Sequence, residues 1–312
     1  MGSAGGGRDA ALVSFGMAFD YRRIDEADRC FLGVACEVKA PRVSVLPIRY
    51  DHTSTWMKGA DRGPDALIAA SREVELFDMS TESEPHLRGI ETLSGIDFDG
   101  PPEELVSMVA TVVGELMDLG RLPFVLGGEH SVSIGAIQAA AARSADEFAT
   151  LQIDAHGDTR DSFHGSTCNH ACVMARAREV GEIVQVGIRA IDRSERERMD
   201  PNRVYTAQRI LEEERRADDR WMDEVVSLLP EKVYLTIDLD AFDAGIMPAT
   251  GTPEPGGLDW RMVTELVRRV ARDRTIVAAD VVELLPHPAH WSCDFLAAKL
   301  VHRVVAEILA AD

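Results

Sequence analysis

The sequence is poor in aromatic residues and has no long hydrophobic run. Aromatic residues make up 6% of its 312 residues, whereas 46% are hydrophobic and 28% are charged, which is typical of a globular protein with a large core. No stretch approaches the roughly 18 to 20 apolar residues of a membrane span, and the opening MGSAGGGRDA lacks the apolar segment of a signal peptide. We therefore expect a cytoplasmic protein without a membrane partner.

Cysteines are few and odd in number, and they are spread along the chain. The five are Cys30, Cys36, Cys168, Cys172 and Cys293. Such a set does not form the paired framework of a small secreted domain, so we expect reduced thiols. Cys168, His170 and Cys172 stand at alternate positions, but this pattern lacks a matching fourth ligand for a zinc site.

Basic residues are also in deficit, with 33 against 53 acidic residues and a formal net charge of −20. This charge opposes binding to a phosphate backbone, so we expect no nucleic-acid partner, and it attracts small cations. Most acidic residues in such a chain only keep its surface solvated. The exceptions here are several carboxylates that follow apolar strands.

Short β-branched runs alternate with amphipathic stretches along the chain. The predicted strands are 43–48, 124–126, 150–154, 183–188, 233–237 and 275–282. The predicted helices are 103–119, 132–143, 260–272 and 295–309. This alternation predicts an α/β protein whose parallel sheet is covered by helices on both faces. We expect a partly flexible N-terminal extension over 1–35 and a single domain over 36–312, because no linker or repeat divides the rest.

In a parallel α/β fold, ligands gather at the carboxyl ends of the strands. The strand at 150–153 runs into Asp154, His156 and Asp158, at positions i, i+2 and i+4. If the extended conformation continues, all three side chains point to one face and form part of a metal coordination shell. A capped surface loop would explain these three residues about equally well.

Two further strand ends carry residues of the same type. Asp238 and Asp240 follow an apolar strand, where unpaired carboxylates would repel each other and lose hydration, so a divalent cation between them is favoured. The glycine pair before His130 matches no phosphate-binding motif. It favours a tight turn that delivers His130 to the same edge of the sheet, with Ser131 available to cap the next helix.

The candidate ligands together are two imidazoles and four carboxylates. They are His130, Asp154, His156, Asp158, Asp238 and Asp240. Two divalent ions would balance the four negative charges, and oxygen-rich ligation without thiolates favours manganese over zinc or copper. Two such ions, about 3.5 to 4 Å apart, can activate water as a nucleophile at neutral pH.

Three motifs carry a resemblance to a known family. They are Gly127-Gly-Glu-His-Ser131, Asp154-Ala-His-Gly-Asp158 and Asp238-Leu-Asp-Ala-Phe-Asp243, the last followed by Thr250-Gly-Thr-Pro-Glu-Pro-Gly-Gly257. In this order they make the chain resemble the arginase, agmatinase and formiminoglutamase family of ureohydrolases. The resemblance implies a three-layer α/β/α fold, two Mn²⁺ ions per chain, hydrolysis of a guanidino compound to an amine and urea, and a homotrimer or homohexamer.

The family's functional residues can be carried over by position. The six candidate ligands match the family's metal ligands, His170 matches its proton-shuttling histidine, and Glu283 matches its guanidinium-binding glutamate. The chain departs from many members at Gly157, Ala171 and Ala244. Of these, Ala171 borders the implied substrate mouth and leaves the specificity open.

The segment from Thr159 to His170 bears on the substrate. It lacks the polar run with which arginases hold an α-carboxylate and an α-amine, and it resembles agmatinases. We therefore expect agmatine, a small cation that suits an acidic protein, to yield putrescine and urea. Arg160 leaves a guanidino acid such as 4-guanidinobutyrate as an alternative, with arginine and formiminoglutamate as others. A non-catalytic regulatory member of the fold is disfavoured by the complete ligand set.

Overall fold

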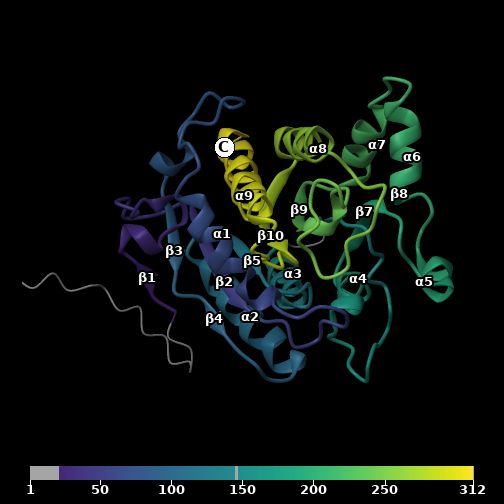
Figure 1. The fold of residues 1–312 in the computed structure, drawn as a ribbon, viewed down its shortest axis with the longest axis horizontal. Helices are drawn as coiled ribbons and strands as arrows, with labels where there is room; N and C mark the ends of the chain where they lie inside the picture. Colours follow the sequence, from purple (N-terminus) through teal and green to yellow (C-terminus); the bar gives the residue numbers. More distant parts are fainter. Residues whose placement is uncertain (1–20, 145–146, 312) are drawn as a thin grey trace, which may run out of the picture.

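The computed structural model describes residues 21–144 and 147–311, whose strands form a single ten-stranded sheet (Figure 1). The strands are β1 (Arg23–Ile24), β2 (Val43–Arg49), β3 (Ile90–Leu93), β4 (Ile96–Asp97), β5 (Leu122–Gly127), β6 (Phe148–Ile153), β7 (Glu182–Ile188), β8 (Val204–Thr206), β9 (Lys232–Asp238) and β10 (Thr275–Val282). Their order is β1-β3-β2-β5-β10-β9-β6-β7-β8, with β4 paired to β2. The pairing is parallel except that β1 runs antiparallel to β3.

Helices cover both faces of the sheet. They are α1 (Gly63–Ser71), α2 (Pro102–Asp118), α3 (Val132–Ala142), α4 (Val173–Ala177), α5 (Arg193–Arg198), α6 (Ala207–Glu214), α7 (Arg220–Leu228), α8 (Trp260–Asp273) and α9 (Trp291–Ala311). Helices α2, α3 and α4 share one hydrophobic cluster with the sheet, whereas α1, α8 and α9 share a second cluster on its other side (Figure 1). The expected three-layer α/β/α fold is therefore confirmed.

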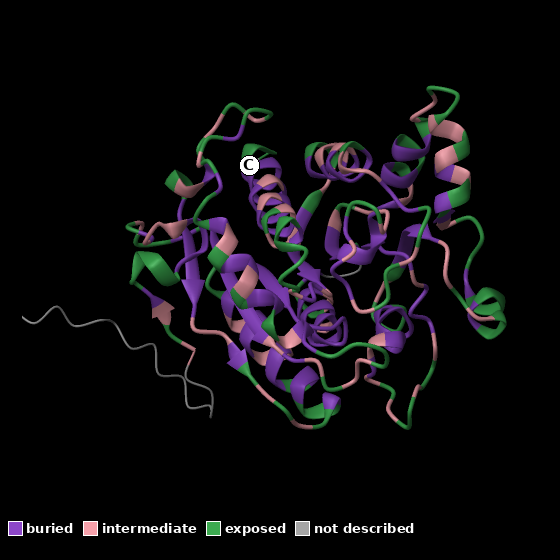
Figure 2. Ribbon diagram, viewed as in Figure 1, coloured by how far each residue is buried: buried purple, intermediate pink, exposed green. Residues whose placement is uncertain are grey.

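The burial pattern explains why the central strands are almost continuously apolar. Every residue of β6 is buried, because helices shield both faces of the sheet. Figure 2 shows buried strands between the helical layers, and exposed residues on the outer sides of the helices. In α8, for example, Leu266 and Val270 enter the core while Arg272 is exposed. Polar residues inside such strands therefore need partners.

The segment before residue 36 contributes to this fold where it is described. Strand β1 pairs with β3, and Phe31 and Leu32 are buried in the core. The expected extension over 1–35 includes residues 1–20, which lie outside the described part of the chain. Among the helices of residues 21–144 and 147–311, none combines the length and the apolar character needed to span a membrane.

Candidate metal centre

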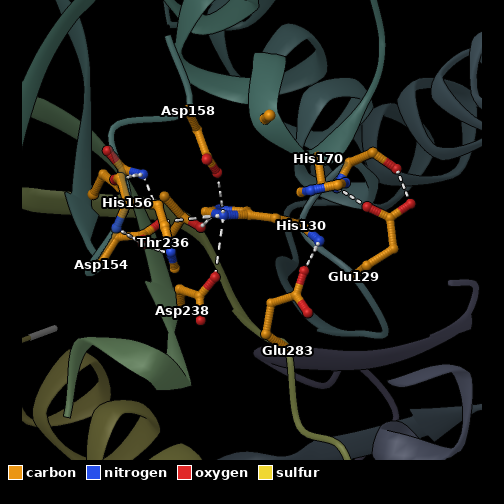
Figure 3. A network of polar contacts seen from close by, with 12 residues as sticks. Glu129, His130, Asp154, His156, Asp158, His170, Thr236, Asp238 and Glu283 are labelled. Atoms are coloured by element: carbon orange, nitrogen blue, oxygen red, sulfur yellow. Dashed lines mark hydrogen bonds and ion pairs between the residues drawn. The ribbon is translucent and has the colours of Figure 1, made fainter. Parts of the chain in front are cut away.

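The candidate ligands lie at the carboxyl ends of central strands of the sheet. His130 follows β5, Asp154 follows β6, Asp238 ends β9, and Glu283 follows β10. Because these strands are neighbours in the order β5-β10-β9-β6, residues after them meet at one edge. Figure 3 shows Asp154, Asp158 and Asp238 converging on the His130 ring.

The first group of ligands surrounds Nδ1 of His130. This atom lies 3.2 Å from Oδ2 of Asp154, 3.1 Å from Oδ2 of Asp158 and 3.5 Å from Oδ2 of Asp238. The ring is 1% exposed, and within the described residues its Nδ1 has no hydrogen-bond partner. This buried nitrogen and the three carboxylate oxygens around it can together serve as ligands for a cation.

The second group is formed by Asp154, His156 and Asp240. Nδ1 of His156 lies 2.8 Å from Oδ2 of Asp240, and the backbone N–H of His156 donates to Oδ1 of Asp154 over 2.6 Å. Donor atoms of these three residues lie within 4.8 Å of one another, as do those of His130, Asp154 and Asp238. Asp154 belongs to both groups, so its two oxygens can face two different cations.

The electrostatics of the cluster also favour cations. Burial raises the pKa of Asp154 to about 7, and the carboxylates of Asp240 and Asp158 add to the rise. Burial and the same kind of repulsion raise the pKa of Asp238 well above its usual value. Burial lowers the pKa of His130, but the surrounding carboxylates outweigh it and raise that pKa. Divalent ions would relieve this repulsion, and the donor set of oxygens and imidazoles without thiolates fits them.

Two details differ from the sequence-based expectation. The extended conformation ends at Ile153, and Asp158 has a φ of 50°, so strand alternation does not bring it to the cluster. Instead its carbonyl accepts the N–H groups of Met174 and Ala175, which fixes the loop. Ser131 stands at the start of α3 but does not cap it, because its hydroxyl donates to Oε1 of Glu129 over 2.6 Å.

The structure places Glu283 against the backbone of His130. The Oε1 atom of Glu283 accepts the N–H of His130 over 2.9 Å, and the residue adopts a φ of 67°. Burial, followed by the charge of Glu129, raises the pKa of Glu283 well above its usual value. A Cβ added at Gly251 would lie 3.7 Å from Oε2, so a glycine lies beside the second oxygen. The carboxylate therefore points into the site with one oxygen held.

His170 begins a short 3-10 segment, η5 (His170–Cys172), and is anchored by Thr53 from the loop after β2. The hydroxyl oxygen of Thr53 lies 3.0 Å from Nδ1 of His170 and accepts its backbone N–H over 3.1 Å. The ring of Phe163 meets the His170 ring edge-on at 6.1 Å. Cys172, in the same segment, is buried, and burial raises the pKa of its thiol to about 11.

Arg160 is engaged by acidic side chains. It forms ion pairs of 3.2 Å with Asp192 and 3.4 Å with Glu195, and its guanidinium lies 4.4 Å from the centre of the Phe163 ring. Arg160 is therefore a salt-bridged residue. A substrate carboxylate would have to compete with two protein carboxylates for it.

Sequence reasoning missed the polar residues that hold the ligands by hydrogen bonds, either directly or through a neighbouring residue. They are Gln152, Gln185, Thr236, Asp280 and Arg189. Arg189 donates to the carbonyl oxygens of Asp240, Phe242 and Glu254, and so holds the loop after β9. The signal was present for Gln152 and Thr236, because each is a polar residue two positions before a ligand in a largely apolar strand, and such positions lie on the same face.

Comparisons with known proteins agree on one family. A model of the arginase family matches residues 41–306. The chain is 35% identical over 275 residues to a Synechocystis protein named N(1)-aminopropylagmatine ureohydrolase, covering 84% of this chain and 88% of the other. It is 30% identical over 274 residues to a Pyrococcus horikoshii protein named agmatinase, covering 86% and 93%. The crystal structure of agmatine ureohydrolase from Thermoplasma volcanium has a TM-score of 0.78 at 29% identity, covering 94% of this chain and 96% of that one.

Proposed function

Since this chain belongs to the arginase family, we propose that it hydrolyses agmatine to putrescine and urea. The family match and the named relatives make it a ureohydrolase, a hydrolase of guanidino compounds. The observation that carries the proposal is the buried cluster around His130, with Glu283 held beside it. A cation-binding centre next to an oriented carboxylate is suited to a guanidinium substrate.

We assign the six clustered ligands to two divalent ions, which we propose to be manganese. The ligands are His130, Asp154, His156, Asp158, Asp238 and Asp240. When bound, such a pair of ions supplies a water-derived nucleophile at neutral pH. The protein's own contribution is to hold the carboxylates close together and to keep Nδ1 of His130 without a hydrogen-bond partner among the described residues.

Glu283 and His170 are assigned to the substrate. The Glu283 carboxylate would pair with the guanidinium, because its Oε1 is held by the His130 N–H and its Oε2 lies beside Gly251. His170 would deliver a proton to the departing amine, which leaves poorly as an anion. The Thr53 hydroxyl accepts the backbone N–H of His170, so its single proton can be donated to Nδ1. Thr53 thus engages Nδ1, and Nε2 is left to face the substrate.

The preference for agmatine over a guanidino acid rests on Arg160. This side chain is paired with Asp192 and Glu195, so it is not free to receive a substrate carboxylate. The net charge of −20 also attracts a substrate that is positive at both ends. Both observations disfavour 4-guanidinobutyrate and arginine.

A second candidate substrate is N(1)-aminopropylagmatine. The observation that favours it is the 35% identity to relatives from Synechocystis and Thermus thermophilus that carry this substrate in their names. The two candidates share the guanidinobutyl group, so the same cluster and the same Glu283 would serve both. They differ in the length and charge of the amine end.

A substrate panel tests the proposal. We expect kcat/KM for agmatine to exceed that for arginine, 4-guanidinobutyrate and formiminoglutamate by at least about tenfold, or about 1.4 kcal/mol. A carboxylate-bearing substrate that is preferred tenfold would reject agmatine as the substrate. A tenfold preference for N(1)-aminopropylagmatine would favour the second candidate.

Two further proposals concern the assembly of the protein and its location. We propose a homotrimer or homohexamer, which sedimentation of the purified protein would measure. We also propose a cytoplasmic location, with which five free thiols are consistent.

A further inference from the structure

We propose that four buried polar residues beneath the metal centre position its ligands, and that they do so as two separate pairs. This polar row consists of Gln185 in β7, Gln152 in β6, Thr236 in β9 and Asp280 in β10. The four residues stand at one register level, because Gln185 pairs with Gln152, Gln152 with Thr236, and Thr236 with Asp280. Each is at most 1% exposed. The inference rests on the proposed binding of two ions by the cluster.

The first pair, Asp280 and Thr236, fixes the ring of His130. A carboxylate only accepts, so the Thr236 hydroxyl donates its proton to Oδ1 of Asp280 over 2.6 Å. The Thr236 oxygen then accepts from Nε2 of His130, 2.9 Å away. This chain holds a proton on Nε2 and leaves the lone pair of Nδ1 facing the carboxylates of the first ligand group (Figure 3).

The second pair, Gln185 and Gln152, fixes the carboxylate of Asp154. The amide of Gln185 donates to the carbonyl oxygen of Gly157 over 2.8 Å, and a carbonyl oxygen can only accept. The same amide nitrogen donates to Oε1 of Gln152 over 2.6 Å, so the nitrogen of Gln152 faces Asp154. It donates to Oδ2 of Asp154 over 2.6 Å. This orientation requires Asp154 to act as an acceptor, as an ionised ligand does.

The two pairs therefore make different predictions for the two ions. His130 belongs to the first ligand group alone, whereas Asp154 belongs to both groups. Losing the Thr236 contact should weaken the binding of one ion. Losing the Gln152 contact should weaken the binding of both.

If the polar row only stabilised the fold, the Thr236 and Gln152 variants would not differ in the number of ions that they affect. The sheet also contains a matched control. Thr150 is a fully buried threonine on β6, two residues before Gln152, and within the described residues its hydroxyl has no hydrogen-bond partner. The sheet therefore accommodates an unpaired threonine hydroxyl. Thr150→Val and Thr236→Val remove the same group from neighbouring strands, but only Thr236→Val removes the link from Asp280 to His130.

The test is a titration of full-length, metal-free protein with Mn²⁺, followed by calorimetry and by electron paramagnetic resonance to count single and paired ions. We expect Thr236→Val to weaken one of two sites about 10- to 100-fold and Gln152→Met to weaken both similarly. Thr236→Ser, which keeps the hydroxyl, and Thr150→Val should bind like the wild type. Thermal denaturation of each metal-free variant establishes that it is folded.

The outcomes separate this inference from the proposed function. If the wild type binds two ions and the Thr236→Val and Gln152→Met variants bind them equally well, the positioning role is wrong while the metal centre stands. If the wild type binds no Mn²⁺ pair, the proposed centre itself is wrong. Should Thr236→Val not fold, Gln152→Met decides alone, and unchanged affinity at both sites overturns the inference.

Discussion

Thr53 and His170 form a pair whose contacts define how the imidazole works. The Thr53 oxygen accepts one N–H from the backbone of His170 and lies 3.0 Å from its Nδ1. The ring is therefore oriented by a residue from a different loop, and Nε2 is left for the substrate. Unlike His130, His170 lies outside both groups of clustered metal-ligand atoms found in residues 21–144 and 147–311.

Replacing His170 by Asn should separate catalysis from metal binding. We expect kcat to fall about 10²- to 10⁴-fold, because general acid assistance to the leaving amine is lost. The metal content, measured by elemental analysis of the loaded protein, should stay at the wild-type value. A parallel loss of metal would instead identify His170 as a ligand, and Asp240→Ala, which removes a cluster carboxylate, provides the comparison.

Thr53→Val tests the orientation of the same ring. The variant removes the hydroxyl but keeps the shape, so we expect kcat to fall about tenfold, equivalent to about 1.4 kcal/mol, which is the size of one hydrogen bond. Thr53→Ser should restore most of the rate. Equal kcat values for the Val variant and the wild type, measured at saturating substrate, would show that the hydroxyl is dispensable.

The residues of the centre were predictable from sequence to different degrees. Asp238 follows an apolar strand, and this context already favoured a cation. The approach of Asp158 was not predictable, because it depends on a φ of 50° and on backbone contacts to Met174 and Ala175. Asp280 was missed for another reason. Its role appears only when β10 is placed beside β9, and pairing between distant strands cannot be read from periodicity.

The long elements of the fold were predicted closely and the short ones were missed. The predicted strand 275–282 is observed as Thr275–Val282, and the predicted helix 132–143 as Val132–Ala142. All six predicted strands and four predicted helices are present. Short strands such as β3 and β8 were not predicted, because three or four residues are too few to establish a period and their pairing depends on neighbouring strands.

The turn between β5 and α3 leaves no room for a side chain at Gly128. A Cβ added at Gly128 would lie 2.0 Å from the carbonyl oxygen of Tyr50, so the backbone would have to move. We expect Gly128→Ala to lower the free energy of unfolding by about 1–3 kcal/mol, as measured in urea, and to weaken metal binding through His130. The control is Gly251→Ala, whose Cβ would meet its nearest neighbour at 3.7 Å. Equal stability of the two variants would contradict this account.

Over the whole molecule, two buried groups bind protons with opposite effects on stability. Burial raises the pKa of Asp154 to about 7, so without metal the folded protein binds a proton that the unfolded chain releases, and stability falls as pH rises toward 7. Burial, with the charge of Lys299, lowers the pKa of His302 to about 4. Stability therefore rises with pH until the pH reaches the ordinary pKa of histidine, near 6.5. His302 contacts the carbonyl of Leu76, away from the metal ligands, so we expect its effect to be the same with and without metal.

The difference between metal-loaded and metal-free protein therefore isolates the centre. We expect the increase in Tm caused by Mn²⁺ to grow between about pH 5 and about pH 7.5, because bound ions require ionised carboxylates and the metal-free cluster loses stability over this range. Asp238, whose pKa is also raised, acts in the same direction. Asp240, whose pKa is lowered, changes the pH dependence of stability only at pH values below the usual pKa of an aspartate. Thermal denaturation with Mn²⁺ or with a chelator measures the difference. A constant difference across this range would mean that the cluster is already ionised without metal. If Asp154 is the source of the pH dependence, Asp154→Asn should make the Tm of the metal-free protein less dependent on pH.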